Sequence, residues 1–252
     1  MIKEDVRYKD GCIFEGMTSI SAVINSEHTD RKIKRVFYDK AREEKLGKAL
    51  LYLRHRAEER GFELIETDGK TLDEMTVGTS HGGVIAECTE RTIKAVTLED
   101  IAENGFYVYI EGIEDPYNFG YALRSLYAAG ADGAILPERN WMSAAGVVCR
   151  SSAGASEYLP LYAATDGMCA LFKNKGYRVF CADTKNAVSV YDTDCKKPIL
   201  LVIGGEKRGI TKKMLEAADR IVMIDYGRDF GASLSAASAS AVLGFEIMRQ
   251  NR

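Results

Sequence analysis

The segment Pro198–Ile210 reads PILLVIGGEKRGI, and it decides the fold class of the C-terminal half of the chain. It opens with an apolar run that shows no alternation of polar and apolar residues. Such a run is typical of a strand that is buried on both faces of a parallel sheet. The run leads directly into a glycine-rich stretch, which marks a turn out of the strand. The segment therefore predicts an inner strand of a parallel sheet, followed by an unusual loop.

Four further apolar runs accompany this strand, and helical segments fall between them. Strands that alternate with helices favour a mostly parallel sheet with helices on both faces, and hence an α/β fold. The runs are FYVYIEGI (106–113), GAILP (133–137), YRVFCAD (177–183) and RIVMIDY (220–226).

The first hundred residues predict a separate, smaller α/β layer. Leu46, Leu50 and Leu53 recur on one face of a charged helix, which Gly61 is expected to end. We place the boundary near residue 97, which gives domains 1–96 and 97–252. The helix is expected over residues 41–61, and the strands are KIKRVFYD (32–39), FELIETD (62–68) and GVIAEC (83–88).

Composition narrows the class of protein. The chain has 252 residues, of which 46% are hydrophobic, and its formal net charge is -3, which argues against a polybasic nucleic-acid binder. The start, MIKEDVRYKD, carries charges where a signal peptide needs an apolar stretch, and no run of about 18 apolar residues follows. We therefore expect a cytoplasmic protein without a membrane span.

Cysteine and histidine usage favours neither a disulfide framework nor a metal site. The six cysteines are dispersed and form no CxxC pair, so they are interpreted as small buried hydrophobic residues. His28, His55 and His81 show no paired spacing, which gives no support to a metal site or a histidine-dependent triad. His81 is either a turn residue or an RNA contact, and Trp141 is expected to be a packing anchor.

Ligands of open parallel sheets bind at the carboxyl ends of the strands, so the loops there are the first candidates for a site. The loop after the first strand holds Asn118 and Arg124, which on their own suggest a helix cap and a solvated arginine. The loop in PILLVIGGEKRGI places Gly204, Gly205 and Gly209 around Glu206, and these glycines would let the backbone approach a ligand. A carboxylate there suits a hydroxyl or a cation better than a phosphate.

Taken in order, three segments resemble the motifs of the SpoU/TrmH family of the SPOUT superfamily, which are RNA ribose methyltransferases. The segment SSAGASEYLP (151–160) resembles a further family segment, and IFEGMTSISAVI (13–24) with TSHGGVIAEC (79–88) resembles the edges of a ribosomal-protein-like RNA-binding domain. The three motif segments are DPYNFGYALRSLYAAG (115–130), LVIGGEKRGI (201–210), and RIVMIDYG (220–227) with ASLS (232–235) and the helix that follows.

The resemblance implies a C-terminal trefoil knot, a homodimer formed through the knotted domain, and S-adenosylmethionine as cofactor. It implies methyl transfer to a ribose 2′-hydroxyl of structured RNA, with ribosomal RNA favoured over transfer RNA. Arg124 would meet the ribose hydroxyl and the adjoining phosphate, Asn118 and Glu206 would hold its side chain, and Ser233 and Ser235 would complete the catalytic group. The residues implied around the cofactor are Thr184, Ile203, Gly204, Glu206, Gly209, Ile224 and Leu234.

Three positions depart from the family pattern. Ser235 stands where the family usually has asparagine, Asp225 where it has proline, and Gly82 where it has glutamine. The first two departures leave open a non-catalytic RNA-binding or ribosome-assembly factor on the same fold. A nucleotide-binding α/β enzyme of another class is a third interpretation, and it rests on the strand–glycine–helix alternation alone.

Overall fold

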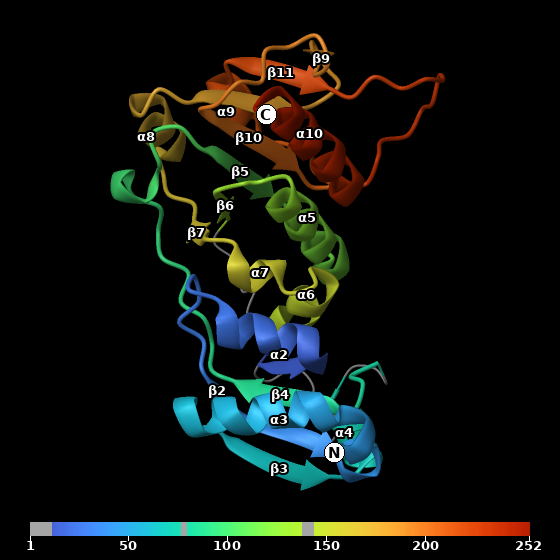
Figure 1. Cartoon of the computed structure of the whole chain (residues 1–252). Coiled ribbons are helices and arrows are strands. Elements are labelled where there is room, and N and C mark those ends of the chain that lie inside the picture. Colours follow the sequence, from blue (N-terminus) through green and yellow to red (C-terminus); the bar gives the residue numbers. More distant parts are fainter. Residues whose placement is uncertain (1–11, 77–79, 138–143) are drawn as a thin grey trace. The chain divides into compact units, whose positions relative to one another are not determined.

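A computed structural model of the chain describes residues 12–76, 80–137 and 144–252 (Figure 1). The chain forms two compact units. The first contains the described parts of Met1–Thr92 and Asn140–Tyr158, and the second those of Ile93–Arg139 and Leu159–Arg252. The sequence boundary near residue 97 lies close to the first change of unit, and the assignment of separate functions to 1–96 and 97–252 stays a prediction. Trp141 lies outside the described residues.

The first unit holds a four-stranded sheet in the order β1-β4-β2-β3 (Figure 1). Strand β3 runs parallel to β2, whereas β4 is antiparallel to both of its neighbours. All three strands that the sequence predicts here are present, and a short first strand adds to them. The elements are β1 (Ile13–Glu15), α2 (Gly16–Asn25), β2 (Ile33–Asp39), α3 (Glu43–Arg60), β3 (Glu63–Thr67), α4 (Gly69–Met75) and β4 (Val84–Cys88).

Helix α3 packs through the leucine face that its sequence predicts. Leu50 and Leu53 are buried in the core of the first unit, and Leu46 packs against the same core while partly exposed. Gly61 ends the helix in the left-handed conformation, with φ of 74°, which a residue without a Cβ atom adopts at little cost. Both predictions for this helix are confirmed.

His81 is a turn residue of the first unit. Its side chain is buried, its Nδ1 accepts a hydrogen bond from the Gly83 amide at 3.1 Å, and its Nε2 lies 3.0 Å from the Asp73 carboxylate. Because Nδ1 accepts, the proton lies on Nε2 and is donated to Asp73. Both ring nitrogens are thus occupied within the chain, which decides against the RNA-contact interpretation.

Helices α6 (Ala145–Ser151) and α7 (Ala155–Tyr158) belong to the first unit, although the sequence analysis placed them in the second domain. The reason is a buried polar network. The Arg31 guanidinium lies 3.3 Å from the Glu157 carboxylate, and both side chains are almost fully buried. Arg91, also buried, donates to the Ser156 carbonyl. A buried charge without such partners costs several kcal/mol, so these contacts tie α7 to this unit. Helix α6 is joined to it by the ion pair of Arg150 with Glu15, at 2.5 Å.

The second unit holds a seven-stranded sheet in the order β7-β6-β5-β10-β8-β11-β9, in which every neighbouring pair is parallel. The five strands that the sequence predicts are all present. Strands β7 and β9 escape sequence analysis because they are only three and two residues long, too short to show a pattern. The strands are β5 (Phe106–Glu111), β6 (Gly133–Leu136), β7 (Leu161–Ala163), β8 (Arg178–Ala182), β9 (Val188–Ser189), β10 (Ile199–Gly204) and β11 (Arg220–Met223).

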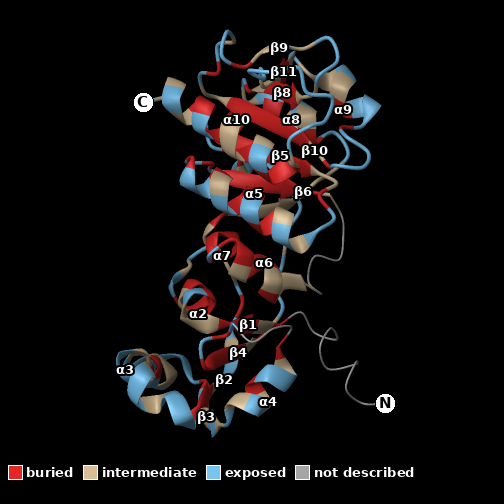
Figure 2. Ribbon diagram, turned by 90° about the vertical axis from the view of Figure 1, so that its right-hand side faces the viewer, coloured by how far each residue is buried: buried red, intermediate tan, exposed pale blue. Residues whose placement is uncertain are grey.

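Helices cover both faces of this sheet, as predicted (Figure 1). Residues of β5 and β10 alternate between the faces: Tyr109 and Val202 pack with α8 (Met168–Asn174) and α9 (Lys212–Ala217). On the other face α10 (Ala236–Gln250) packs against β10 and against α5 (Pro116–Ala128). Figure 2 shows the strands buried between these layers. The trefoil knot stays a prediction from the family resemblance.

The cysteines are packing residues, as the sequence predicts. All six are free thiols; Cys169 is half-buried and the other five are buried. Burial raises the pKa of the Cys195 thiol to about 11, so this thiol is protonated at neutral pH. Within the described part of the chain, no helix combines the length and the apolar character needed to cross a membrane.

Candidate active site

A cavity of about 270 Å³ opens at the carboxyl ends of β8, β10 and β11. Parallel strands end at the same edge of the sheet, so loops far apart in sequence meet there. Every residue that the family resemblance implies for the cofactor lines this cavity, and their binding role stays a prediction. They are Thr184, Ile203, Gly204, Glu206, Gly209, Ile224 and Leu234.

Neighbouring backbone lies so close to the loop after β10 that two of its positions have no room for a side chain. A Cβ atom on Gly205 would overlap the carbonyl group of Gly112, and one on Gly204 would overlap Gly209 and Ile210. Gly205 and Gly209 pair with each other, the Gly209 amide donating to the Gly205 carbonyl at 2.9 Å. The sequence analysis attributed these glycines to the close approach of a ligand, whereas two of them serve backbone-to-backbone contact.

Asn118 reaches from α5 to the loop after β10. Its Nδ2 donates to a Glu206 carboxylate oxygen at 2.9 Å. The helix is capped by Asp115, whose carboxylate accepts from the Asn118 amide at 2.8 Å, and Pro116 occupies the first turn. Asn118 is therefore not a helix cap, and its side chain is free to join the first and second motifs.

Arg124 lies elsewhere on α5. Six positions along a helix correspond to about 120° around its axis, so Arg124 and Asn118 point to different sides. Arg124 is exposed and, among the described residues, has no hydrogen bond or ion pair. It continues an exposed row that begins with Tyr117 and Tyr121. Within one chain the structure brings Asn118 and Glu206 together, but not Arg124.

The third motif lies between β11 and α10. Ser233 and Leu234 line the cavity. Ser235 is the N-cap of α10: its hydroxyl accepts a hydrogen bond from the Ser238 amide at 3.1 Å. Asp225 does not line the cavity, and its carboxylate accepts a hydrogen bond from the Ser189 hydroxyl. The two departures from the family pattern therefore occupy a helix cap and a contact to β9.

We expect the exchange Ser235→Asn to preserve or raise activity. Serine and asparagine are equally good N-cap residues, so the first turn of α10 stays fixed with either side chain. Ser235→Ala removes the cap and is expected to cost about 1 kcal/mol of stability. Thermal unfolding and the rate of methyl transfer of the three proteins test this. A marked loss of activity in Ser235→Asn alone would show that the hydroxyl has a role besides capping.

Sequence reasoning missed two polar residues of the cavity lining. Asp183 follows β8, and its carboxylate accepts hydrogen bonds from the amides of Thr184 and Lys185 at 2.6 and 3.0 Å. Tyr226 follows β11, and its hydroxyl accepts from the Leu234 amide at 3.0 Å. Asp183 comes directly after β8 and Tyr226 lies three residues beyond β11, so the rule that strand ends carry the site, applied to every strand, would have drawn attention to both.

The charges around the cavity suit a cationic ligand. Asp183 and Glu206 contribute carboxylates, and the residues that line the cavity include no lysine or arginine. A phosphate group would be repelled there, whereas a sulfonium would be attracted. Among the described residues, no group of three or more histidine, cysteine or acidic side chains could hold a metal ion.

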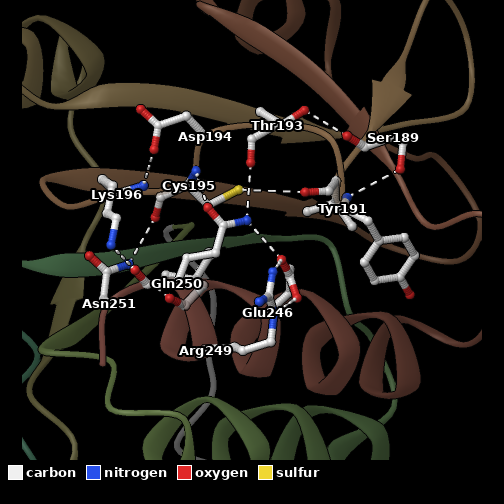
Figure 3. A network of polar contacts seen from close by, with 12 residues as sticks. Ser189, Tyr191, Thr193, Asp194, Cys195, Lys196, Glu246, Arg249, Gln250 and Asn251 are labelled. Carbon is white, nitrogen blue, oxygen red and sulfur yellow. Dashed lines mark hydrogen bonds and ion pairs between the residues drawn. The ribbon is translucent and has the colours of Figure 1, made fainter.

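The far end of α10 is fastened to the loop that follows β9 (Figure 3). The Gln250 amide accepts from the Cys195 backbone N–H at 2.8 Å and donates to the Thr193 carbonyl at 3.0 Å. Asn251 donates to the Cys195 carbonyl at 2.9 Å and accepts from the Lys197 amide at 2.9 Å. The same helix lines the cavity at its other end, so these contacts fix the helix that carries the third motif.

We expect Gln250→Ala to lower stability by about 1–3 kcal/mol, because it leaves the half-buried Cys195 amide without its acceptor. Gln250→Glu is the matched comparison: it retains an acceptor but loses both donor bonds and faces Glu246. Glu246 is charged, since Arg249 lowers its pKa. Thermal unfolding should rank the wild type above both variants. An unchanged midpoint in Gln250→Ala would show that the contact does not hold the helix.

Comparison with known proteins agrees with this arrangement. The sequence model of the SpoU rRNA Methylase family matches residues 105–245, and that for RNA 2'-O ribose methyltransferase substrate binding matches residues 13–93.

Two curated relatives and one solved structure are similar over most of the chain. The 23S rRNA (guanosine-2'-O-)-methyltransferase RlmB of Shewanella oneidensis is 28% identical over 97% of this chain and 99% of its own. A protein of the same name from a Burkholderia species is 30% identical, over 86% and 89%. The methyltransferase AviRb of Streptomyces viridochromogenes, solved with AdoMet, superposes with a TM-score of 0.74 at 25% identity, over 95% and 91%.

Proposed function

Since the chain belongs to the SpoU rRNA methylase family, we propose that it transfers a methyl group from S-adenosylmethionine to a ribose 2′-hydroxyl of ribosomal RNA. The observation that carries the proposal is the cavity at the ends of β8, β10 and β11, which gathers all seven residues expected around the cofactor. Two RlmB relatives act on 23S rRNA by their names, which favours ribosomal RNA over transfer RNA.

The lining of the cavity suits the proposed cofactor in polarity and charge. When bound, S-adenosylmethionine supplies an electrophilic methyl group on a sulfonium centre. Ile203, Ile224 and Leu234 offer apolar contacts, and Gly204 and Gly209 also line the cavity. The carboxylates of Asp183 and Glu206 favour a positive charge in the cavity. Asn118, which holds Glu206, would fix the orientation of that carboxylate.

Arg124 would act on the RNA side of the reaction. Methyl transfer needs the ribose oxygen in line with the methyl group and a route for the hydroxyl proton. A guanidinium is a poor base at its ordinary pKa, but it binds a phosphate through two parallel hydrogen bonds. We therefore assign Arg124 to positioning the target nucleotide, with Ser233 and Ser235 beside the cavity.

We further propose a homodimer that is formed through the exposed face of α5 and α10. Large side chains on this face are half exposed in the single chain, namely Tyr117, Tyr121, Tyr127 and Phe245. Arg124 shares the row of Tyr117 and Tyr121. A second copy that packs on this row would place its own cavity near Arg124, which the cavity of the same chain does not approach. Sedimentation of the purified protein measures the oligomeric state.

The first unit would bind the RNA, since residues 13–93 match the substrate-binding family model. The net charge of -3 then requires that basic side chains gather on the RNA-facing surface and acidic ones elsewhere. We place the reaction in the cytoplasm, where the ribosomal RNA substrate would be met.

The decisive experiment combines cofactor binding with methyl mapping. The protein is titrated with S-adenosylmethionine in a calorimeter, and then incubated with labelled cofactor and total RNA from a strain that lacks the gene. We expect binding, and labelled 2′-O-methyl groups in ribosomal RNA that mass spectrometry maps to the nucleotide. Absence of both binding and incorporation would overturn the proposal. Tight RNA binding without 2′-O-methyl product would instead favour the assembly factor.

A further inference from the structure

A second, shallower cavity adjoins the candidate active site. It has a volume of about 400 Å³ and lies on the loop between β11 and α10, which extends away from the sheet (Figure 1). Tyr226 and Leu234 line both cavities. Whatever occupies the second cavity is therefore next to a molecule in the first. Its lining residues are Asp225, Tyr226, Gly227, Arg228, Phe230 and Leu234.

The loop presents an aromatic side chain to solvent at this cavity. Phe230 is 61% exposed, although a phenylalanine ring is stabilised by removal from water. Its ring lies 6.2 Å from that of Tyr226, tilted by 50°. The Leu234 amide donates to the Tyr226 hydroxyl, which closes the loop and anchors the second ring. The Phe230 ring thus lies beside a Tyr226 ring that a hydrogen bond holds in place.

A cationic side chain stands two residues away. Arg228 is exposed and, within the described residues, has neither a hydrogen bond nor an ion pair. An exposed aromatic ring next to a free guanidinium is the combination that binds an unpaired nucleotide, because the ring stacks on the base and the guanidinium binds the phosphate. A peptide partner would not require both groups beside the methyl-transfer cavity.

We propose that this loop is a nucleobase subsite: Phe230 stacks on the base of the nucleotide that is methylated or of its direct neighbour, and Arg228 binds the adjoining phosphate. The inference rests on the proposed function, and it assigns a specificity role to residues outside the family motifs. A ribose hydroxyl that enters the first cavity leaves its base within reach of the loop, since the two cavities share Tyr226 and Leu234.

The test crosses a protein change with an RNA change. The full-length protein carries Phe230→Ala, Phe230→Trp or, as a matched control, Tyr191→Ala, which removes an exposed aromatic ring that lines neither cavity. The RNA is a synthetic fragment that contains the mapped nucleotide, with or without its base. Affinity for RNA, affinity for S-adenosylmethionine and kcat/KM are measured for each pair, and sedimentation gives the oligomeric state.

We expect Phe230→Ala to lower kcat/KM and RNA affinity by about 10-fold on the intact fragment and to have no further effect on the abasic one. Phe230→Trp and Tyr191→Ala should match the wild type, and cofactor affinity should not change. An equal loss on both fragments, or dissociation of a dimer by Phe230→Ala, would overturn the subsite. In the latter case the ring is covered by a second copy of the chain.

Arg228 gives an independent measurement. Arg228→Ala should lower the slope of log Kd for RNA against log salt by about 0.7–1, whereas Phe230→Ala should leave the slope unchanged. Arg220→Ala, an exposed arginine at the start of β11, is the control and should not change the slope. An unchanged slope in Arg228→Ala would remove the phosphate contact from the proposal.

The two proposals fail in different ways. If the wild-type protein methylates no RNA, the proposed function fails, and the subsite is judged by binding alone to transcribed ribosomal RNA. Weaker binding by Phe230→Ala than by Tyr191→Ala would then support the subsite, and equal binding would overturn it. If the wild type methylates RNA and all variants match it, only the subsite fails.

Discussion

Replacing Arg124 by alanine is expected to lower kcat about 100-fold or more, while the Kd of S-adenosylmethionine changes less than about twofold. The reason is the place of Arg124 in the fold. It is exposed on α5 and does not line the cavity in which the residues expected around the cofactor meet. The loss should therefore appear in turnover and in RNA binding. Single-turnover methylation and calorimetry separate the two effects.

Two variants make the Arg124 prediction sharper. Arg124→Lys retains the positive charge but not the planar fork, so it should recover only part of the activity if two-point phosphate contact matters. Arg220→Ala is the control. It removes an exposed arginine at the start of β11, the end of the strand away from the cavity, and should match the wild type. Loss of cofactor affinity in Arg124→Ala would contradict the assignment to the RNA side.

Gly205→Ala is expected to be the most damaging small change in the second unit. A methyl group there would overlap the carbonyl of Gly112, so one of the two loops must move. Overpacking of this kind costs about 1–3 kcal/mol or more, which lowers the melting temperature by about 5–10 °C for a unit of this size. Because the loop after β10 lines the cavity, S-adenosylmethionine should also bind more weakly, and calorimetry measures this.

Gly47→Ala is the control for this substitution. Gly47 lies inside helix α3, and a Cβ atom there meets no other atom within 4 Å. Alanine is the better helix former, so this variant should be as stable as the wild type or more stable by about 0.5–1 kcal/mol. Equal melting temperatures for the wild type and Gly205→Ala would show that the Gly112 loop yields without cost.

The fold class follows from local patterns in the sequence. The runs in 106–113 and 198–205 are apolar on both faces, which is typical of a strand covered on both sides. Strand β9 has two residues and no such run, because its place at the edge of the sheet leaves Val188 exposed. Periodicity detects burial, so it misses elements that are barely buried.

Only part of the candidate site could be predicted from the sequence. The residues expected around the cofactor are mostly glycines and apolar residues at strand ends, and their convergence follows once the strands are parallel. The contact between Asn118 and Glu206 spans 88 positions, and no local pattern indicates it. The transfer of 144–158 to the first unit depends on the pairing of Arg31 with Glu157, which are 126 positions apart.

The sequence by itself determined the α/β class, the five inner strands and the three loops of the candidate site, because these depend on composition and spacing along the chain. The tertiary structure alone decided that Ser235 caps a helix, that Gly205 faces Gly112, and that Arg124 stands apart from Asn118. These facts depend on the direction in which each side chain leaves its element and on what lies opposite it. Both are set by packing between segments that are distant in sequence.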